Sequence, residues 1–398
     1  MDKFTKWVAC WGTATSITDR NECVYAKDIT LRYPIKLCFS GNSLRLHFSN
    51  LTGTEPVELT NVYVLRTDKK LAAFLDEREK VAVATLEGNP TIVIEPGEEV
   101  VTDEIVFKNA NDMNDKLEFV AGETIEISIY LKNATQMNAG TLVTGPLSGG
   151  KYSYGNHALD ENPPAEVTRS TNWYYFLNTI DIFTEEKNHA LICYGDSITA
   201  QSWPDYLAIR AFVQGYRDIS IIRRAVCGTR ILRQYDCITY QAYGLKGETR
   251  FPLETEVAGA TGVIIQHGIN DIIHPVGEEV NMWRPWSDLP TLEEMTEGVT
   301  KLYINHAKEK GLKVYGGTLL PIYGWRTYEE FRDELRVGFN EWIRTSSLFD
   351  GVVDFDKAVR NEEFPKAFRE GFDSGDHLHP SETAYEAMAE AVPVELLK

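Results

Sequence analysis

The sequence predicts two domains: an N-terminal β-sandwich of jelly-roll type over residues 1–185, and an α/β domain with a parallel sheet over residues 186–398. Three observations support this prediction. The chain has 398 residues, which is more than one typical domain contains. Short segments in which apolar and polar residues alternate fill its first part. Continuous apolar runs, separated by helix-length stretches, fill its second part.

The strands expected in the first domain have one apolar face. In residues 42–50 (NSLRLHFSN), Leu44, Leu46 and Phe48 lie on the same side of an extended chain. Residues 123–131 (ETIEISIYL) repeat the alternation, as expected for strands that cover a core with one face. We further expect turns at 49–56 and 94–100, a polar interruption at 156–171, a closing strand at 172–183 and a linker at 184–188.

The second domain changes to the pattern of βαβ units. Unbroken apolar runs are typical of parallel strands that are buried on both faces. We expect five such strands, at residues 190–195, 219–226, 262–269, 313–320 and 351–355. The clearest helices between them are expected at 202–214 and 291–310.

Composition limits the classes of partner. Hydrophobic residues make up 43% and charged residues 25% of the chain, as in soluble globular proteins. The net charge of −19 disfavours nucleic acids and anionic membranes as partners, and leaves a homo-oligomer open. The first residues show no apolar segment of the kind found in secretory signals, and the six cysteines are widely spread. We therefore expect a cytoplasmic protein with free thiols.

Polar residues follow the first three expected strands of the second domain. Ser197 comes after the first strand, Gly228 after the second and Asn270 after the third. Open α/β sheets bind ligands outside the carboxyl ends of their strands, so these residues are expected to face one crevice. Together they supply a hydroxyl nucleophile, a bare backbone N–H and a carboxamide donor, which are the groups that acyl transfer requires.

A base for the serine is found near the C-terminus, in the segment FDSGDHLHPSETAYEAMAE. Asp376 and His379 are three residues apart, so their side chains can meet if the segment makes a helical turn. Asp376 would then orient the imidazole, and the other ring nitrogen would be free to take the proton of Ser197.

These residues also carry a family resemblance. GDSIT, the glycine of RRAVCGTRIL, GIND and DHLHP are similar, in this order, to the four blocks of the SGNH hydrolase superfamily of GDSL esterases and lipases. WGTA, TLRYPIKLCFSGNSLRLHFSN and the segments around GGTLLPIYGW and GDHLHPSETAYEAMA resemble bacterial acylhydrolases that have an N-terminal β-domain. The resemblance covers most of the chain.

The resemblance implies a flavodoxin-like catalytic domain and a serine esterase that uses no cofactor and no metal. It implies Ser197 as the nucleophile, His379 as the base and Asp376 as the residue that orients the base. It assigns the oxyanion hole to the backbone N–H groups of Ser197 and Gly228 and to the side chain of Asn270. By the same analogy, the expected substrate is a small-molecule or oligosaccharide ester, with O-acetyl groups on carbohydrates favoured.

The acids, histidines and cysteine near these blocks have structural interpretations. Asp196 and Asp271 are expected to brace their loops, and His267 and His274 to pack. A zinc site at His377 and His379 lacks a second ligand group with suitable spacing. A thiol role for Cys227 is disfavoured, since a small buried residue fits a strand end better.

Two interpretations of the indoles of Trp283, Trp286 and Trp325 are equally well supported by the sequence. They either bind substrate, by stacking on sugar rings or by lining an acyl pocket, or they form the core of long loops. Two alternative functions also stay open. One is a lipase, thioesterase or arylesterase with the same catalytic residues, and the other is a carbohydrate-binding protein without catalysis.

Overall fold

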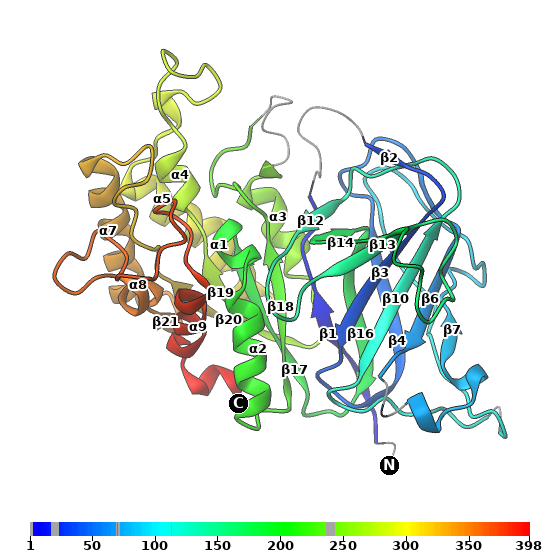
Figure 1. Cartoon of the computed structure of the whole chain (residues 1–398). Helices are drawn as coiled ribbons and strands as arrows, with labels where there is room; N and C mark the ends of the chain where they lie inside the picture. The colour runs from blue at the N-terminus through cyan, green and yellow to red at the C-terminus, as the bar shows by residue number, and fades with distance from the viewer. Residues whose placement is uncertain (1–2, 17–23, 69, 71, 113, 236–242) are drawn as a thin grey trace. The chain divides into compact units, whose positions relative to one another are not determined.

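The computed structural model of the protein describes residues 3–16, 24–68, 70, 72–112, 114–235 and 243–398 (Figure 1). The chain divides into two compact units. The first contains the chain up to Ala190 together with Arg217–Ile222, and the second contains Leu191–Tyr216 and Arg223–Lys398. The expected linker is a tight turn between β16 (Leu177–Thr184) and β17 (His189–Gly195), closed by a bond from Asn188 N–H to Glu185 O of 3.1 Å.

The first unit is built from antiparallel strands, so the expected N-terminal β domain is confirmed. One sheet has the order β1 (Lys6–Gly12), β16, β4 (Gly41–Ser49) and β9 (Glu99–Val101). A larger sheet has the order β14 (Thr168–Thr171), β13 (Gly150–Tyr154), β3 (Ile29–Lys36), β10 (Thr124–Leu131), β6 (Asn61–Arg66) and β7 (Val81–Val83). Smaller pairs join β2 (Tyr25–Ala26) to β11 (Thr135–Gln136), β12 (Gly140–Leu142) to β15 (Trp173–Tyr175), and β5 (Val57–Leu59) to β8 (Ile92–Ile94).

Alternating polarity determines which side of these strands is buried. Leu44, Leu46 and Phe48 of β4 are fully buried, as the pattern predicts. Arg45 and His47 on the opposite face bind one carboxylate of the neighbouring strand, that of Asp181, at 2.7 and 2.9 Å. The β-domain is therefore confirmed at the level of its strands, while the jelly-roll topology stays a prediction.

The parallel sheet lies in the part of the chain predicted to be α/β. Its order is β18 (Ile219–Ala225), β17, β19 (Ala260–Gln266), β20 (Lys313–Gly317) and β21 (Gly351–Val353). Numbered along the chain, this is the order 2-1-3-4-5 of flavodoxin-like sheets, which confirms the expected fold. The order reverses between β17 and β19, and such a switch point is where ligands of these folds bind.

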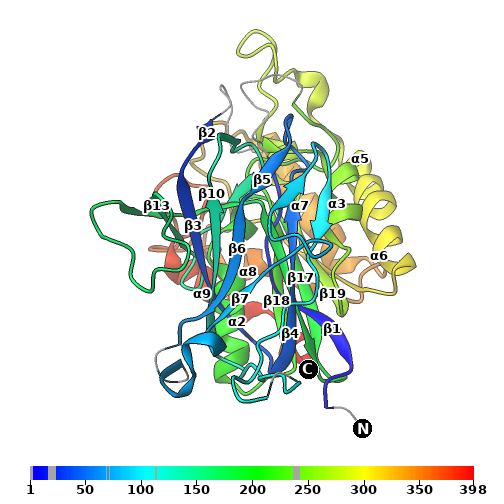
Figure 2. The ribbon, with the colours of Figure 1, turned by 90° about the vertical axis from the view of Figure 1, so that its right-hand side faces the viewer.

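Helices cover both faces of this sheet. Figure 2 shows α2 (Trp203–Val213) and α9 (Glu382–Ala391) on one side, and α3 (Gly247–Glu254), α5 (Leu292–Val299) and α6 (Asn305–Glu309) on the other. The helix expected at 291–310 is continuous, because a π-helical turn, Thr300–Ile304, joins α5 to α6. The remaining helices are α1 (Ser197–Ala200), α4 (Ile269–Ile273), α7 (Glu330–Thr345) and α8 (Phe355–Val359), with 3₁₀ turns at Ala72–Phe74, Glu77–Glu79, Trp286–Asp288 and Val394–Leu397.

The strands end earlier than the apolar runs do. β19 ends at Gln266 and β20 at Gly317, although the runs continue to residues 269 and 320. After β19 a short turn leads to Ile269, the first residue of α4, and after β20 residues 318–320 form a buried turn, so these apolar side chains lie outside the sheet. Among the described residues, no helix is both long and apolar enough to cross a bilayer.

Candidate active site

The first strand of the parallel sheet ends in the turn that carries Ser197. β17 stops at Gly195, and Ser197 is the first residue of α1, whose N-cap is Asp196. The Asp196 carboxylate accepts the N–H of Ile198 at 3.1 Å, which is the usual way to begin a helix. A Cβ at position 195 would lie 2.5 Å from the carbonyl oxygen of Gln266, so only glycine fits between the two strands.

The segment around Asp376 is organised by that carboxylate. Its Oδ1 accepts the N–H groups of Leu378 at 2.9 Å and His379 at 2.8 Å, and its Oδ2 lies 2.6 Å from His379 Nδ1. The expected helical turn is absent here, since the residues form bends and His377 has a φ of +64°. The three-residue spacing still brings acid and imidazole together, through a turn that the Asp376 side chain itself closes.

The structure brings Ser197, His379 and Asp376 into one hydrogen-bonded line. Ser197 Oγ lies 2.9 Å from His379 Nε2, while His379 Nδ1 faces Asp376. Because the carboxylate accepts a hydrogen bond from Nδ1–H, the ring proton stays on Nδ1, and Nε2 can accept the proton of the serine hydroxyl. Burial raises the pKa of Asp376, but the bonds from the His379 ring and from backbone N–H groups outweigh it, so the net pKa is lowered and the group stays ionised.

Gly228 lies in the turn that follows β18. Its φ of +75° is in the left-handed region that favours glycine, and a Cβ there would lie 2.4 Å from the ring of Tyr243. Tyr243 therefore packs directly on the backbone that the sequence predicts to supply an oxyanion donor. This residue was not predicted as part of the site, because no local pattern links it to a glycine fifteen positions earlier.

Asn270 joins the turn after β19 to the turn after β18. Its buried side chain donates from Nδ2 to the carbonyl oxygen of Thr229 at 3.0 Å, next to Gly228. A carboxamide has two N–H groups, so this bond uses one and leaves the second for a ligand. The three residues predicted from the strand ends thus lie on three neighbouring turns of the sheet.

The neighbouring acids brace loops, as predicted. Asp271 accepts the N–H groups of Ile231 at 2.8 Å and Leu232 at 3.1 Å, and Asp196 caps α1. Burial raises the pKa of Asp271 to about 6, against the lowering effect of the Ile231 bond. These bonds fix the loop that follows Gly228.

The expected packing role of His267 is confirmed as well. Its ring is buried, with Nδ1 2.8 Å from Tyr303 Oη and Nε2 3.0 Å from Thr229 Oγ1. Burial, with the nearby Arg250 charge, lowers the pKa of His267 to about 3, so the ring is neutral. Within the described ranges, no three His, Cys, Asp or Glu side chains form a cluster that could hold a metal ion.

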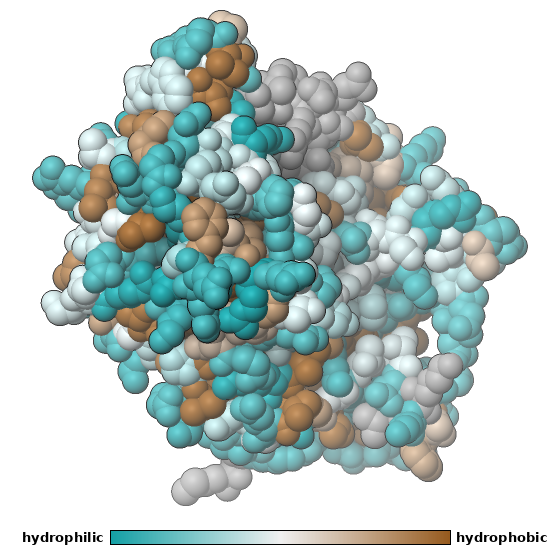
Figure 3. Space-filling view, turned by 60° about the vertical axis from the view of Figure 1, so that its left-hand side comes forward, coloured by the Kyte–Doolittle hydropathy of each residue, from teal (hydrophilic) through white to brown (hydrophobic). Residues whose placement is uncertain are grey.

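The tryptophans differ in exposure. Trp283 and Trp286 are 47% and 42% exposed, so the core interpretation is wrong for these two. Trp325 follows Gly324, where a Cβ would lie 2.8 Å from the His377 ring, so its loop packs beside the His379 segment. On the face of the molecule drawn in Figure 3, hydrophobic residues lie in small groups rather than in one large patch. Among described residues, no contact joins these indoles to Ser197 or His379, and their binding role stays a prediction.

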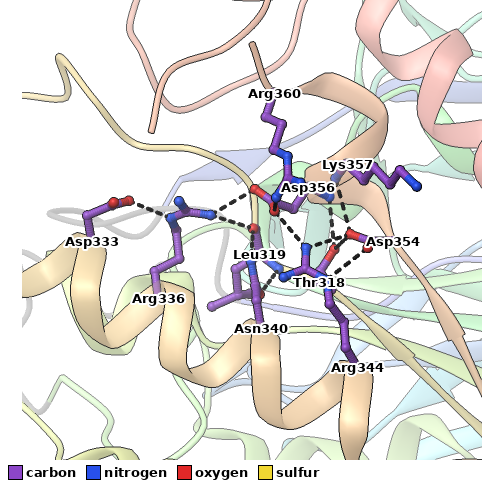
Figure 4. Close-up of polar contacts among 10 residues, drawn as sticks. All are labelled: Thr318, Leu319, Asp333, Arg336, Asn340, Arg344, Asp354, Asp356, Lys357 and Arg360. Carbon is purple, nitrogen blue, oxygen red and sulfur yellow. Dashed lines mark hydrogen bonds and ion pairs between the residues drawn. The ribbon is translucent and has the colours of Figure 1, made fainter. Parts of the chain in front are cut away.

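A separate network of buried charges secures the turns after β20 and β21 (Figure 4). Asp356 binds Arg336 at 2.9 Å and Arg344 at 2.7 Å. Asn340 pins Leu319, whose N–H donates to Oδ1 at 2.7 Å and whose carbonyl accepts from Nδ2 at 2.8 Å. None of these bonds involves the turns that carry Ser197, Gly228 or Asn270.

The pKa of Asp196 gives a test of this geometry. Burial raises it from 3.8 to about 7, although the Ile198 N–H bond lowers it, and its Oδ2 has no partner among the described residues. The unfolded chain therefore releases this proton at lower pH than the folded chain does. The free energy of unfolding contributed by Asp196 falls as the pH rises from about 4 to about 7.

We therefore expect Asp196→Asn to become more stable relative to the wild type as the pH rises through this window. Asparagine keeps an oxygen for the helix cap but cannot ionise. Thermal unfolding of both proteins at several pH values measures the difference. A difference in melting temperature that does not vary with pH would contradict the buried position of this carboxyl.

Comparisons with known proteins agree with the fold of the second unit. Residues 193–387 match the model of the GDSL-like lipase/acylhydrolase family. Similar solved structures include a GDSL-like lipase from Bacteroides thetaiotaomicron (18% identity, 52% of this chain, 87% of that chain, TM-score 0.35). Another is an acetylxylan esterase from Geobacillus stearothermophilus (16% identity, 53% of this chain, 96% of that chain, TM-score 0.37). At TM-scores this low, neither structure bears on the substrate of this chain, and the search of curated proteins found no match.

Proposed function

The second unit of this chain is a GDSL-like lipase/acylhydrolase domain of the SGNH hydrolase superfamily, and from this premise we propose that the protein hydrolyses short-chain esters, chiefly O-acetyl esters of carbohydrates, through an acyl-enzyme. The single observation that best supports the mechanism is the line from Ser197 through His379 to Asp376, with distances of 2.9 and 2.6 Å. Nucleophile, base and orienting acid in hydrogen-bond contact are the arrangement that activates a serine.

In the proposed first step, Ser197 Oγ attacks the carbonyl carbon of the ester while His379 Nε2 takes the hydroxyl proton. The tetrahedral intermediate collapses, its bond to the alkoxy oxygen breaks, and His379 gives the proton to the departing alcohol. Water then attacks the acyl-serine with His379 again as the base, which releases the acid and restores the hydroxyl. Asp376 remains ionised throughout, in keeping with its lowered pKa, and stabilises the imidazolium.

The oxyanion of the intermediate needs donors that already point at it. We assign them to the backbone N–H groups of Ser197 and Gly228 and to the free N–H of Asn270. The left-handed φ of Gly228 and the Asn270 bond to Thr229 support this assignment, because both hold the donors on adjacent turns.

The proposed substrate class rests on exposed side chains of the loop after α4 and on the net charge. Exposed indoles such as Trp283 and Trp286 are flat apolar surfaces on which sugar rings stack. The net charge of −19 favours neutral substrates over anionic ones. Val280 and Met282 in the same loop are 70% and 69% exposed, and this favours one rival, an esterase for longer acyl chains.

We expect Ser197→Ala and His379→Ala each to lower kcat for p-nitrophenyl acetate by several orders of magnitude, because the two residues act as one unit. Asp376→Ala should cost less, since it removes orientation but not the base. Steady-state kinetics with circular dichroism as a check on folding measures these losses.

Ser202→Ala is the matched control, because Ser202 is a buried serine near the site whose hydroxyl bonds Glu382 at 2.9 Å. It should retain activity. A fluorophosphonate should label the wild type and not Ser197→Ala. Activity of more than a few per cent in Ser197→Ala would rule out this nucleophile, and a wild type that is neither labelled nor active would favour the non-catalytic binding protein.

For Asn270→Ala we expect kcat to fall about 10²- to 10³-fold with KM little changed, because the donor acts on a charge present only in the intermediate. Asn270→Asp should be at least as poor, since a carboxylate repels the oxyanion. Asn340→Ala is the control: it removes a buried carboxamide that pins another strand-end turn (Figure 4). It should lower the melting temperature and spare kcat. If Asn270→Ala behaves in the same way, Asn270 only ties down its loop.

The acyl group and the alcohol can be tested separately. With p-nitrophenyl esters of increasing chain length, kcat/KM should fall steeply beyond butyrate, whereas a maximum at long chains would favour the lipase alternative. Trp283→Ala and Trp286→Ala should raise KM for acetylated xylo-oligosaccharides and leave p-nitrophenyl acetate unaffected. Unchanged KM for both substrates would exclude these indoles from sugar binding.

A further inference from the structure

Helix α3 places one buried arginine behind the proposed oxyanion hole. Arg250 is 2% exposed, and a guanidinium group has five N–H donors. All five are used: Nε and Nη2 bind Glu254 at 3.0 Å each, Nη1 binds Thr229 Oγ1 at 2.8 Å and Gly195 O at 3.3 Å, and Nη2 binds Arg224 O at 3.4 Å. Its charge also lies over the ring of Tyr194, 4.9 Å from the centroid.

Two of these acceptors, Gly195 O and Thr229 Oγ1, lie on the two chain segments whose backbone N–H groups are the proposed oxyanion donors. Gly195 is two residues before Ser197, and Thr229 directly follows Gly228. A single guanidinium plane therefore joins the end of β17 to the turn after β18.

We propose that Arg250 is a positioning residue that sets the distance between the N–H groups of Ser197 and Gly228. This inference rests on the proposed function, in which both groups stabilise one oxyanion. The donors must lie within a few tenths of an ångström of their best position, and a shift of about 1 Å can cost about 10²-fold in rate. A rigid, planar group that binds both segments at once limits such shifts.

Arginine is suited to this task and lysine is not. A lysine ammonium is a point charge with three donors on a flexible stem, so it cannot bind Glu254 in a fork and both segments together. Glu254 is needed as well, because an unpaired buried charge would be strongly unfavourable. The Thr229 hydroxyl, which accepts from Arg250, also lies 2.9 Å from Val226 O and 3.0 Å from Nε2 of the neutral His267 ring, so the hydrogen bonds extend from Arg250 to both of these groups.

The test compares Arg250→Lys with Arg336→Lys. Arg336 is equally buried, binds Asp333 on its own helix at 2.8 Å and the loop carbonyl of Leu319 at 3.3 Å, but serves the turn after β20 (Figure 4). We expect kcat of Arg250→Lys for p-nitrophenyl acetate to fall about 10- to 100-fold, with KM within about two-fold of the wild type. Arg336→Lys should lower the melting temperature and keep kcat within about two-fold.

A tetrahedral inhibitor gives a readout that a general loss of stability does not change. Phenylboronic acid forms a tetrahedral adduct with a reactive serine, so its Ki should rise by the factor by which kcat falls. Because Arg250→Lys could fail to fold, Thr229→Val and Thr229→Ser provide a second test. Valine keeps the shape of the side chain but removes the hydroxyl that Arg250 binds, along with the bonds of that hydroxyl to Val226 O and His267, and should lower kcat. Serine keeps the hydroxyl and should restore kcat.

The inference is overturned if both Arg250→Lys and Thr229→Val keep kcat and the boronic acid Ki within about two-fold of the wild type. It is also overturned if Arg336→Lys loses kcat to the same extent, since any buried arginine would then have this effect. The proposed function fails separately: in that case Ser197→Ala keeps the wild-type activity, or the wild type has none.

Discussion

The carbonyl oxygen of Gly195 is the group on which the geometry of this site depends. It accepts the N–H of Val226 at 3.3 Å and an N–H of Arg250 at 3.3 Å. On the other side of the strand, the absence of a side chain lets the carbonyl of Gln266 approach within 2.5 Å of the place a Cβ would take. The end of β17 is thus held between both neighbouring strands, and the direction in which Ser197 leaves the sheet follows from this.

Most polar groups around the site are buried, and their burial has a cost that hydrogen bonds only partly offset. The pKa of Asp196 is raised to about 7 and that of Asp271 to about 6, in each case first by burial. The pKa of His267 is lowered to about 3 for the same reason. For the two carboxyl groups, burial therefore costs stability at neutral pH, and such shifts are common where chemistry takes place.

Local sequence patterns were sufficient to predict which site residues lie at the ends of the strands. Apolar runs predicted all five parallel strands, and the carboxyl ends of parallel strands meet at one edge, so Ser197, Gly228 and Asn270 could be placed together. The pairing of Asp376 with His379 followed from their spacing, although the helical turn expected there is replaced by a turn that the Asp376 side chain closes. Trp283 and Trp286 show the limit of such patterns, because an indole in a long loop is compatible with both a buried and an exposed position.

The sequence by itself determined the two-part organisation, the alternation of strands and helices in the second part, and the strand-end residues, because each depends on signals within a few positions along the chain. The flavodoxin-like order of the strands was expected from the family resemblance and not from these local signals. Only the tertiary structure decided that Arg250 binds Gly195, Arg224 and Thr229, or that Tyr243 packs on Gly228. No pattern in residues 247–254 indicates which strand ends α3 meets. That depends on how the helix packs against the sheet, and packing joins residues whose separation in sequence carries no periodic signal.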